Sequence, residues 1–152
     1  METLILQTDL LETNRLFLKE MTPEWLRYAL ANFSDTELMK LFGFNTAEEL
    51  AVERQKYSAG MTTFSISFRN FLMQLKTTGE TIGRIGFHTW QVRHFRAEIG
   101  YAITNNAHKN QGYMTEAMKA VIDYGFGTMG LERIEACVGP GNTPSIKLVE
   151  KL

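Results

Sequence analysis

The sequence predicts an α+β domain in which helices flank a sheet. Three observations lead to this prediction. Capped helix starts crowd the first third of the chain, and apolar residues alternate with a period of two in the middle. After residue 97, a strand, a polar turn and a helix follow one another. A period of two is typical of strands and a spacing of three to four is typical of helices. With 152 residues the chain is long enough for one core and too short for two.

Composition excludes several classes of function. Hydrophobic residues make up 44% of the chain and charged residues 22%, as in soluble globular proteins. The formal net charge is -1 and Lys and Arg form no cluster, which argues against a nucleic-acid partner. No apolar run approaches the ~20 residues of a membrane span. Glu2 and Asp9 lie where a signal peptide would be basic, and the lone Cys137 suits a reducing compartment, so we expect a cytoplasmic protein.

A strand over residues 12–19 is expected first, ending before Met21, and three short helices follow it. Each helix start carries a hydroxyl that can accept hydrogen bonds from the unpaired N–H groups of the first turn. Gly43 suits the end of the second helix, and the third is expected to reach about Tyr57. The apolar residues 38–44 are expected in the core or, alternatively, in the wall of a substrate pocket. The three starts are Thr22–Pro23, Ser34–Glu37 and Thr46–Glu49.

Alternation then predicts a β-hairpin. Residues 77–80 (Thr-Thr-Gly-Glu) form its turn, with Gly79 where a positive φ is required. A polar loop over residues 90–96 should follow the second strand of the hairpin. The alternating apolar residues are Phe64, Ile66, Phe68, Phe71, Met73 and Leu75 before the turn, and Ile82, Ile85 and Phe87 after it.

The next strand, residues 97–103, presents two different faces. Ile99, Tyr101 and Ile103 share one face, whereas the other face carries Glu98, Gly100 and Ala102. Glycine inside a strand often marks the close approach of a ligand or of another backbone. We therefore expect a ligand near this strand.

A polar turn and Gly112 come directly after this strand and begin a helix. The apolar stripe from Met114 to Gly125 is expected in the core. The first turn of the helix has unpaired N–H groups, and the helix dipole adds partial positive charge there. Such a turn binds anions, most often phosphate, so we expect it to hold the pyrophosphate of a cofactor. A strand is expected next, over residues 131–138, and it is parallel to its predecessor if the helix is a crossover. The chain then ends in a helix that starts at Asn142-Thr143-Pro144.

Other phosphate-binding and catalytic motifs are absent from the sequence. No G-x-x-x-x-G-K-[ST] is present, and no G-x-G-x-x-G opens a helix, so neither a P-loop nor a dinucleotide fold is supported. No cluster of His, Cys, Asp or Glu has the spacing of metal ligands, so no metal is expected. No serine lies in a nucleophile-elbow pattern.

Several ordered segments together resemble the GCN5-related N-acetyltransferase (GNAT) family. Residues 109–114 (Lys-Asn-Gln-Gly-Tyr-Met) are similar to its acetyl-CoA signature, which is Arg or Gln, two variable residues, Gly, one variable residue, then Gly or Ala. The similarity covers nearly the whole chain. The other matching segments, 13–16, 97–101, 112–117 and 142–152, resemble in the right order the branch of ribosomal-protein N-terminal acetyltransferases (RimJ/RimL-like).

This resemblance implies a fold and an activity. The fold is a three-layer arrangement whose mixed, mostly antiparallel, twisted sheet has splayed central parallel strands. The activity is direct transfer of the acetyl group of acetyl-CoA to a primary amine, either a protein N-terminus or a small molecule, in a ternary complex. The alternative is a non-catalytic module of the same fold that binds acyl-CoA or a partner. Residues 1–152 would then form one acyl-CoA N-acyltransferase domain.

The resemblance also implies site residues. A free N–H near the end of the 97–103 strand would bind the acetyl carbonyl, the turn would bind the pyrophosphate, and Asn142 would bind the pantetheine arm. Cofactor contacts are thus expected from Ile103, Thr104, Lys109, Asn110, Gln111, Gly112, Tyr113, Met114, Thr115 and Asn142.

Three residues are candidates for the proton transfers. Glu98 is the expected base, acting through a water, unless it is a surface carboxylate paired with Arg93 or Arg96. His88 is the competing base, since histidine titrates near neutrality, although a lone histidine is more often structural. Ser145 holds the position that in this branch can protonate the thiolate, and its alternative is an ordinary helix serine.

The sequence departs from the family pattern at three points. Lys109 replaces the usual Arg or Gln and lacks the planar fork of Arg. Met114 replaces Gly or Ala and narrows the approach to the turn. The two strands that follow in the family are absent from this sequence, and in the family they cover the sheet edge beside residues 131–138. We expect either a second copy, in a homodimer, to cover this edge or the sequence to be truncated.

Overall fold

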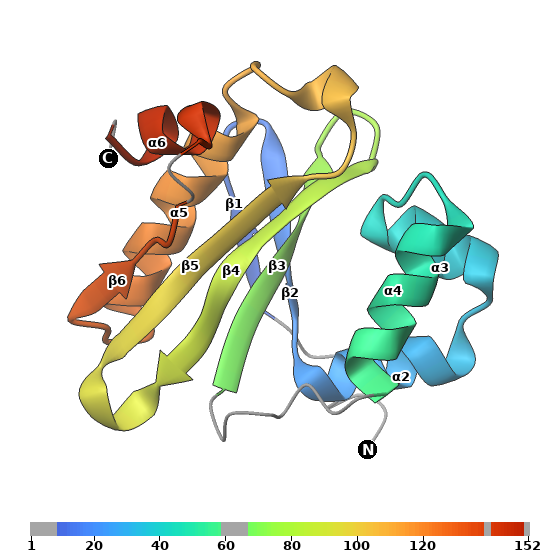
Figure 1. Ribbon diagram of the computed structural model, residues 1–152, viewed down its shortest axis with the longest axis horizontal. Coiled ribbons are helices and arrows are strands. Elements are labelled where there is room, and N and C mark those ends of the chain that lie inside the picture. The colour runs from blue at the N-terminus through green and yellow to red at the C-terminus, as the bar shows by residue number, and fades with distance from the viewer. Residues whose placement is uncertain (1–8, 59–66, 139–140, 151–152) are drawn as a thin grey trace.

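The computed structural model describes residues 9–58, 67–138 and 141–150, and it shows a six-stranded sheet between two layers of helices (Figure 1). Neighbouring strands are antiparallel except for the last two, β5 and β6, which are parallel. The predicted mixed, mostly antiparallel α+β architecture is therefore confirmed. In spatial order the strands are β1 (Leu10–Glu12), β2 (Leu16–Met21), β3 (Ser67–Leu75), β4 (Thr81–Gln91), β5 (Arg96–Ile103) and β6 (Arg133–Glu135).

Both faces of the sheet are covered. Helices α2 (Pro23–Asn32), α3 (Asp35–Phe42) and α4 (Ala47–Ser58) cover one face, and α5 (Tyr113–Gly127) covers the other (Figure 1). Helix α6 (Thr143–Glu150) lies beside the first turns of α5.

Adjacent residues of β3 show how the two cores arise. Phe71 is buried with Phe87 and Val121 under α5, whereas Leu72 points the other way and is buried with Phe42 of the α2–α4 layer. Successive side chains of a strand alternate between the two faces of its sheet. Since each face meets a helix layer, both are apolar at this point of the strand.

The three predicted helix starts are confirmed by their hydrogen bonds. Thr22 Oγ1 accepts from the N–H of Trp25 at 3.1 Å, and Thr46 Oγ1 accepts from that of Glu49 at 3.2 Å. Ser34 and Glu37 form the reciprocal capping box. These bonds satisfy donors that the first turn of a helix cannot satisfy itself.

The predicted first strand, 12–19, is wrong in extent. It is two antiparallel strands, β1 and β2, and β2 continues to Met21. The break comes at Thr13, whose N–H donates to the Leu16 carbonyl at 2.9 Å and whose hydroxyl accepts from the Leu16 N–H at 3.1 Å. Threonine side chains offer the backbone such local bonds in place of a ladder, and here they form a turn.

The second strand of the predicted hairpin, β4, is longer than predicted. The turn at Gly79 is present, with φ +74°. β4 continues to Gln91, and a 3-10 turn over Val92–His94 replaces most of the predicted 90–96 loop. The predicted alternation at residues 64–66 lies outside the described residues.

The last strand is much shorter than the predicted 131–138. β6 spans three residues, and its parallel register with β5 ends at the pair Glu98–Glu135. Beyond that pair the two strands separate, so the end of β5 has β4 as its neighbour on one side and an opening on the other. The following helix begins at Thr143, within the predicted start at residues 142–144, and Asn142 caps it because its Oδ1 accepts from the Ser145 N–H at 3.3 Å.

Candidate functional site

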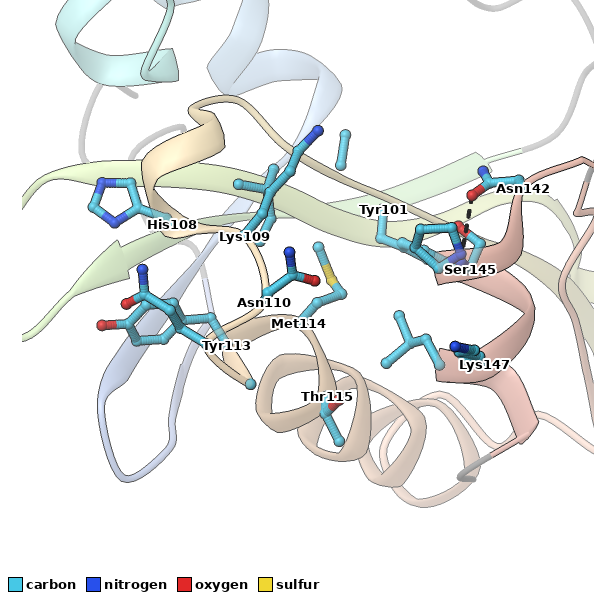
Figure 2. A pocket seen from close by; sticks show the side chains of 16 residues that line it. Tyr101, His108, Lys109, Asn110, Tyr113, Met114, Thr115, Asn142, Ser145 and Lys147 are labelled. Carbon is cyan, nitrogen blue, oxygen red and sulfur yellow. Dashed lines mark hydrogen bonds between the residues drawn. The ribbon is translucent and has the colours of Figure 1, made fainter.

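A cleft of about 610 Å³ lies between the end of β5, the first turn of α5 and α6 (Figure 2). The separation of β5 from β6 opens this space. The cleft thus occupies the place where the sequence predicted an anion site. The lining residues are Tyr101, Ala102, Ile103, His108, Lys109, Asn110, Gln111, Gly112, Tyr113, Met114, Thr115, Asn142, Pro144, Ser145, Lys147 and Leu148.

The N-terminus of α5 has no side-chain cap. Its N-cap is Gly112, with φ +81° and no side chain to accept a hydrogen bond. The first backbone bond of this helix runs from the N–H of Glu116 to the Gly112 carbonyl, so residues 113–115 lack intrahelical acceptors for their N–H groups. In α2, α3, α4 and α6 a side chain caps the first turn, which makes α5 the exception among the described α-helices.

The uncapped turn can bind an anion. Residues 113–115 line the cleft, and the dipole of α5, a helix of 15 residues, adds partial positive charge there. Asn110, just before it, has a left-handed φ of +62°. Where left-handed residues interrupt right-handed backbone, several N–H groups can converge on one side. A pyrophosphate is an anion of the kind that this arrangement accepts.

One of the two N–H groups predicted to hold the acetyl carbonyl is not free. The Thr104 N–H donates to the Ile82 carbonyl at 2.9 Å, and Thr104 does not line the cleft, so this N–H is already paired within the sheet. N–H groups alternate in direction along a strand. The Ile103 N–H therefore points away from β4, toward the opening.

The first turn of α6 contributes two of the predicted residues. Asn142 and Ser145 both line the cleft, and Figure 2 shows the bond between them. Since Asn142 Oδ1 already accepts this bond, the side chain offers its amide nitrogen to a ligand. Ser145 presents its hydroxyl from the same helix turn.

Glu98 and His88 lie together but outside the cleft lining. They face each other across β4 and β5, with His88 Nδ1 3.6 Å from Glu98 Oε2. Among the described residues, His88 is the basic side chain within 4.0 Å of the Glu98 carboxylate, in place of the predicted alternatives Arg93 and Arg96. Gly100 leaves room for the imidazole ring, because a Cβ there would lie 3.0 Å from His88 Cδ2.

Two of the three departures from the family pattern, Lys109 and Met114, lie at the cleft. Lys109 lines it, and in Figure 2 its ammonium group points away from the first turn of α5. Met114 also lines the cleft, and its side chain lies beside the N-terminal end of the helix. Hydrogen bonds from the turn to a ligand would come from the backbone, which both substitutions leave intact.

Sequence reasoning missed several residues of the cleft. The Tyr101 hydroxyl is buried without a hydrogen-bond partner among the described residues, although the side chain lines the cleft. An isolated buried hydroxyl is costly unless a ligand or water satisfies it. His108 and Lys147 also line the cleft. One signal in the sequence could have identified Tyr101 as a cleft residue, because it lies on the same strand face as Ile103.

A second network connects α5 to the turn between β1 and β2. Glu116 accepts from the Thr13 hydroxyl, from the Arg15 N–H at 2.9 Å and from Arg15 Nε at 2.9 Å. Burial raises the pKa of Glu116, but the hydrogen bonds from Thr13 and Arg15 outweigh it and hold that pKa below the ordinary value of 4.5. The Glu116 carboxylate is therefore ionised at neutral pH.

Two features are absent from residues 9–58, 67–138 and 141–150. No helix there is long and apolar enough to cross a membrane. No group of three or more His, Cys, Asp or Glu side chains there is arranged to hold a metal ion.

Comparison with known proteins gives concordant matches. The family model described as an acetyltransferase (GNAT) domain matches residues 15–152. The uncharacterised N-acetyltransferase p20 of Bacillus licheniformis is 36% identical over 146 residues, which are 95% of this chain and 81% of that protein. The uncharacterised N-acetyltransferase YoaA of Bacillus subtilis is 32% identical over 148 residues, 94% of this chain and 81% of that protein.

A solved structure agrees with these sequence matches. The crystal structure of a GNAT-family acetyltransferase from Bacillus anthracis superposes with a TM-score of 0.62 at 29% identity. The match covers 94% of this chain and 81% of that one.

Proposed function

Because this chain belongs to the GNAT family of acetyltransferases, we propose that it transfers the acetyl group of acetyl-CoA to a primary amine. The acceptor would be a protein N-terminus or a small-molecule amine, which would attack the carbonyl of the thioester directly in a ternary complex. The observation that carries the proposal is the uncapped N-terminus of α5 in a cleft that opens at the end of β5.

The residues present fit acetyl-CoA. The N–H groups of residues 112–115 would bind the pyrophosphate, helped by the Thr115 hydroxyl. The pantetheine arm would lie along Asn142, and the buried Tyr101 hydroxyl would gain its missing partner. When bound, acetyl-CoA supplies an activated acetyl group as a thioester.

Acetyl transfer asks three things of the protein, and each has a candidate group. The Ile103 N–H would polarise the thioester carbonyl, as a donor placed where negative charge develops. The Ser145 hydroxyl would give a proton to the departing sulfur. Glu98 would accept the proton of the amine through a water, since it lies beyond the cleft lining, with His88 as the competing base.

The alternative function is a non-catalytic module of the same fold that binds acyl-CoA or a partner. Isothermal titration with acetyl-CoA, followed by a free-thiol assay over a panel of amines, separates the two. We expect binding, and thiol release that depends on one class of amine. Binding without release for any amine would favour the module, and no binding would reject both. A cytoplasmic location and a homodimer that covers the β6 edge stay predictions.

A further inference from the structure

Arg15 lies behind the turn that precedes α5. Its Nη1 donates to the Gln111 carbonyl at 3.0 Å, and its guanidinium carbon is 4.2 Å from the centre of the Tyr113 ring. A Cβ at Gly112 would lie 3.4 Å from Arg15 Nη2, which places the guanidinium in contact with this glycine. Arg15 itself is not a lining residue of the cleft. It therefore contacts three consecutive residues of the turn without lining the cleft itself.

Glu116 fixes Arg15 in this position. One carboxylate oxygen accepts from Arg15 Nε and the other from the Arg15 backbone N–H, both at 2.9 Å. The guanidinium is a planar fork, so it can bond Glu116 along one edge and the Gln111 carbonyl along another while its face stacks on Tyr113. A lysine has a single ammonium group and cannot make these contacts together.

The bond to Gln111 has a consequence for the neighbouring peptide N–H. In a trans peptide the C=O and N–H groups point in opposite directions, and no cis peptide is present among the described residues. A Gln111 carbonyl held toward Arg15 therefore turns the Gly112 N–H away from Arg15, and Gly112 itself lines the cleft. Gly112, on the C-terminal side of this peptide, has a φ of +81°, and Asn110, just before Gln111, has a φ of +62°, which is unfavourable for a residue with a side chain. Such a conformation persists only where surrounding contacts hold it.

We propose that Arg15 is a positioning residue for the cofactor, which orients the Gly112 N–H toward the pyrophosphate from behind the turn. This inference rests on the proposed function, because it concerns the same site. It assigns to the β1–β2 turn a role in cofactor affinity.

The test uses two variants of Arg15 and a neighbouring control. Arg15→Met removes the guanidinium and keeps much of the volume, and Arg15→Lys keeps only the charge. Lys76→Met is the control, because Lys76 pairs with Glu12 at 2.6 Å and its backbone N–H bonds the Arg15 carbonyl at 3.0 Å. Each protein is titrated with acetyl-CoA, assayed with S-acetylpantetheine, a thioester without phosphates, and checked by circular dichroism.

We expect Arg15→Met to raise the Kd of acetyl-CoA roughly tenfold, equivalent to about 1.4 kcal/mol. Arg15→Lys should lie between Arg15→Met and the wild type, and Lys76→Met should bind like the wild type. The kcat/KM with S-acetylpantetheine should change little in any of them. Equal losses with both thioesters, or no difference between Arg15→Met and Lys76→Met, would overturn the inference.

Two controls keep the inference separate from the proposed function. If Arg15→Met does not fold, Arg15→Lys decides, since an unchanged Kd there overturns the role of the fork. If the wild type itself fails to bind acetyl-CoA, the proposed function falls and the inference falls with it.

Discussion

The imidazole Nδ1 of His88 lies 3.6 Å from Glu98 Oε2, across the paired strands β4 and β5. Both side chains are partly exposed, with 49% and 31% of their surface accessible. A carboxylate and an imidazole at this separation can share the removal of a proton, so single substitutions are needed to assign the base.

Glu98→Gln should lower kcat by about 100-fold or more, because a general base contributes about 10²–10⁴ to a rate. His88→Gln should have a smaller effect if His88 only assists Glu98. Glu135→Gln is the matched control, since Glu135 is the register partner of Glu98 on β6. The measurement is kcat against pH at saturating acetyl-CoA. A larger loss in His88→Gln would give the role to the histidine.

Ser145→Ala should lower kcat by about 10-fold to 100-fold and leave the KM for acetyl-CoA nearly unchanged. The physical reason is that a hydroxyl that protonates the leaving sulfur acts in the transition state more than in the bound state. Steady-state kinetics with the best amine of the panel provide the measurement. A kcat equal to that of the wild type would leave Ser145 as an ordinary residue of α6.

Tyr101→Phe should not destabilise the free protein, because the hydroxyl that it removes is buried without a partner in the described structure. The rise in Tm on addition of acetyl-CoA should, however, be smaller than in the wild type. Thermal unfolding with and without acetyl-CoA measures both effects. An equal rise in the two proteins would exclude the Tyr101 hydroxyl from the cofactor contacts.

The raised pKa of Tyr124 predicts that the protein loses stability at alkaline pH. Burial, together with its hydrogen bond to Asp9 at 2.8 Å, raises the pKa of Tyr124 from 10.0 to about 12. Between these values the unfolded chain has lost the phenolic proton and the folded chain keeps it. The free energy of unfolding should therefore fall as pH rises from 10 to 12, by about 2 kcal/mol. Urea unfolding of wild type and Tyr124→Phe isolates this component, which Tyr124→Phe should lack.

Gly43→Ala should destabilise the fold by about 2 kcal/mol or more. Gly43 has φ +73°, and a Cβ there would lie 2.2 Å from the Thr81 carbonyl oxygen. Gly79→Ala is the matched control, because Gly79 has φ +74° with nothing within 4 Å of its Cβ position. Gly79→Ala should therefore lose only the stability that backbone strain costs, about 1 kcal/mol. Equal midpoints in urea for the two variants would contradict the predicted clash.

Features that depend on residues close together in the sequence were predicted better than features that depend on distant residues. Thr22 and Ser34 act on N–H groups three residues away, so the sequence alone located their helices. The anion-binding turn was predictable for the same reason, because a strand, Gly112 and a helix are consecutive in the chain.

Contacts between distant segments left no comparable signal. Arg15 meets Glu116 across 101 residues of sequence, and neither residue type indicates such a pairing. The free N–H at the end of β5 could be narrowed to Ile103 only once the register with β4 was known. The extent of β6 was likewise set by where it separates from β5, which its own apolar residues do not encode.

The burial of both faces of the sheet has a consequence for β4. Its Ile85 and Phe87 lie in the core beneath α5, while the opposite side of the strand meets the α2–α4 layer. A Cβ at Gly83 would lie 2.4 Å from the Ala102 carbonyl oxygen, and one at Gly86 would lie 2.3 Å from that of Arg69. Neighbouring backbones thus leave no room for a side chain at either of these two glycines of β4. Substitutions should therefore be tolerated least along β4, and accepted substitutions should accumulate in the helices and turns.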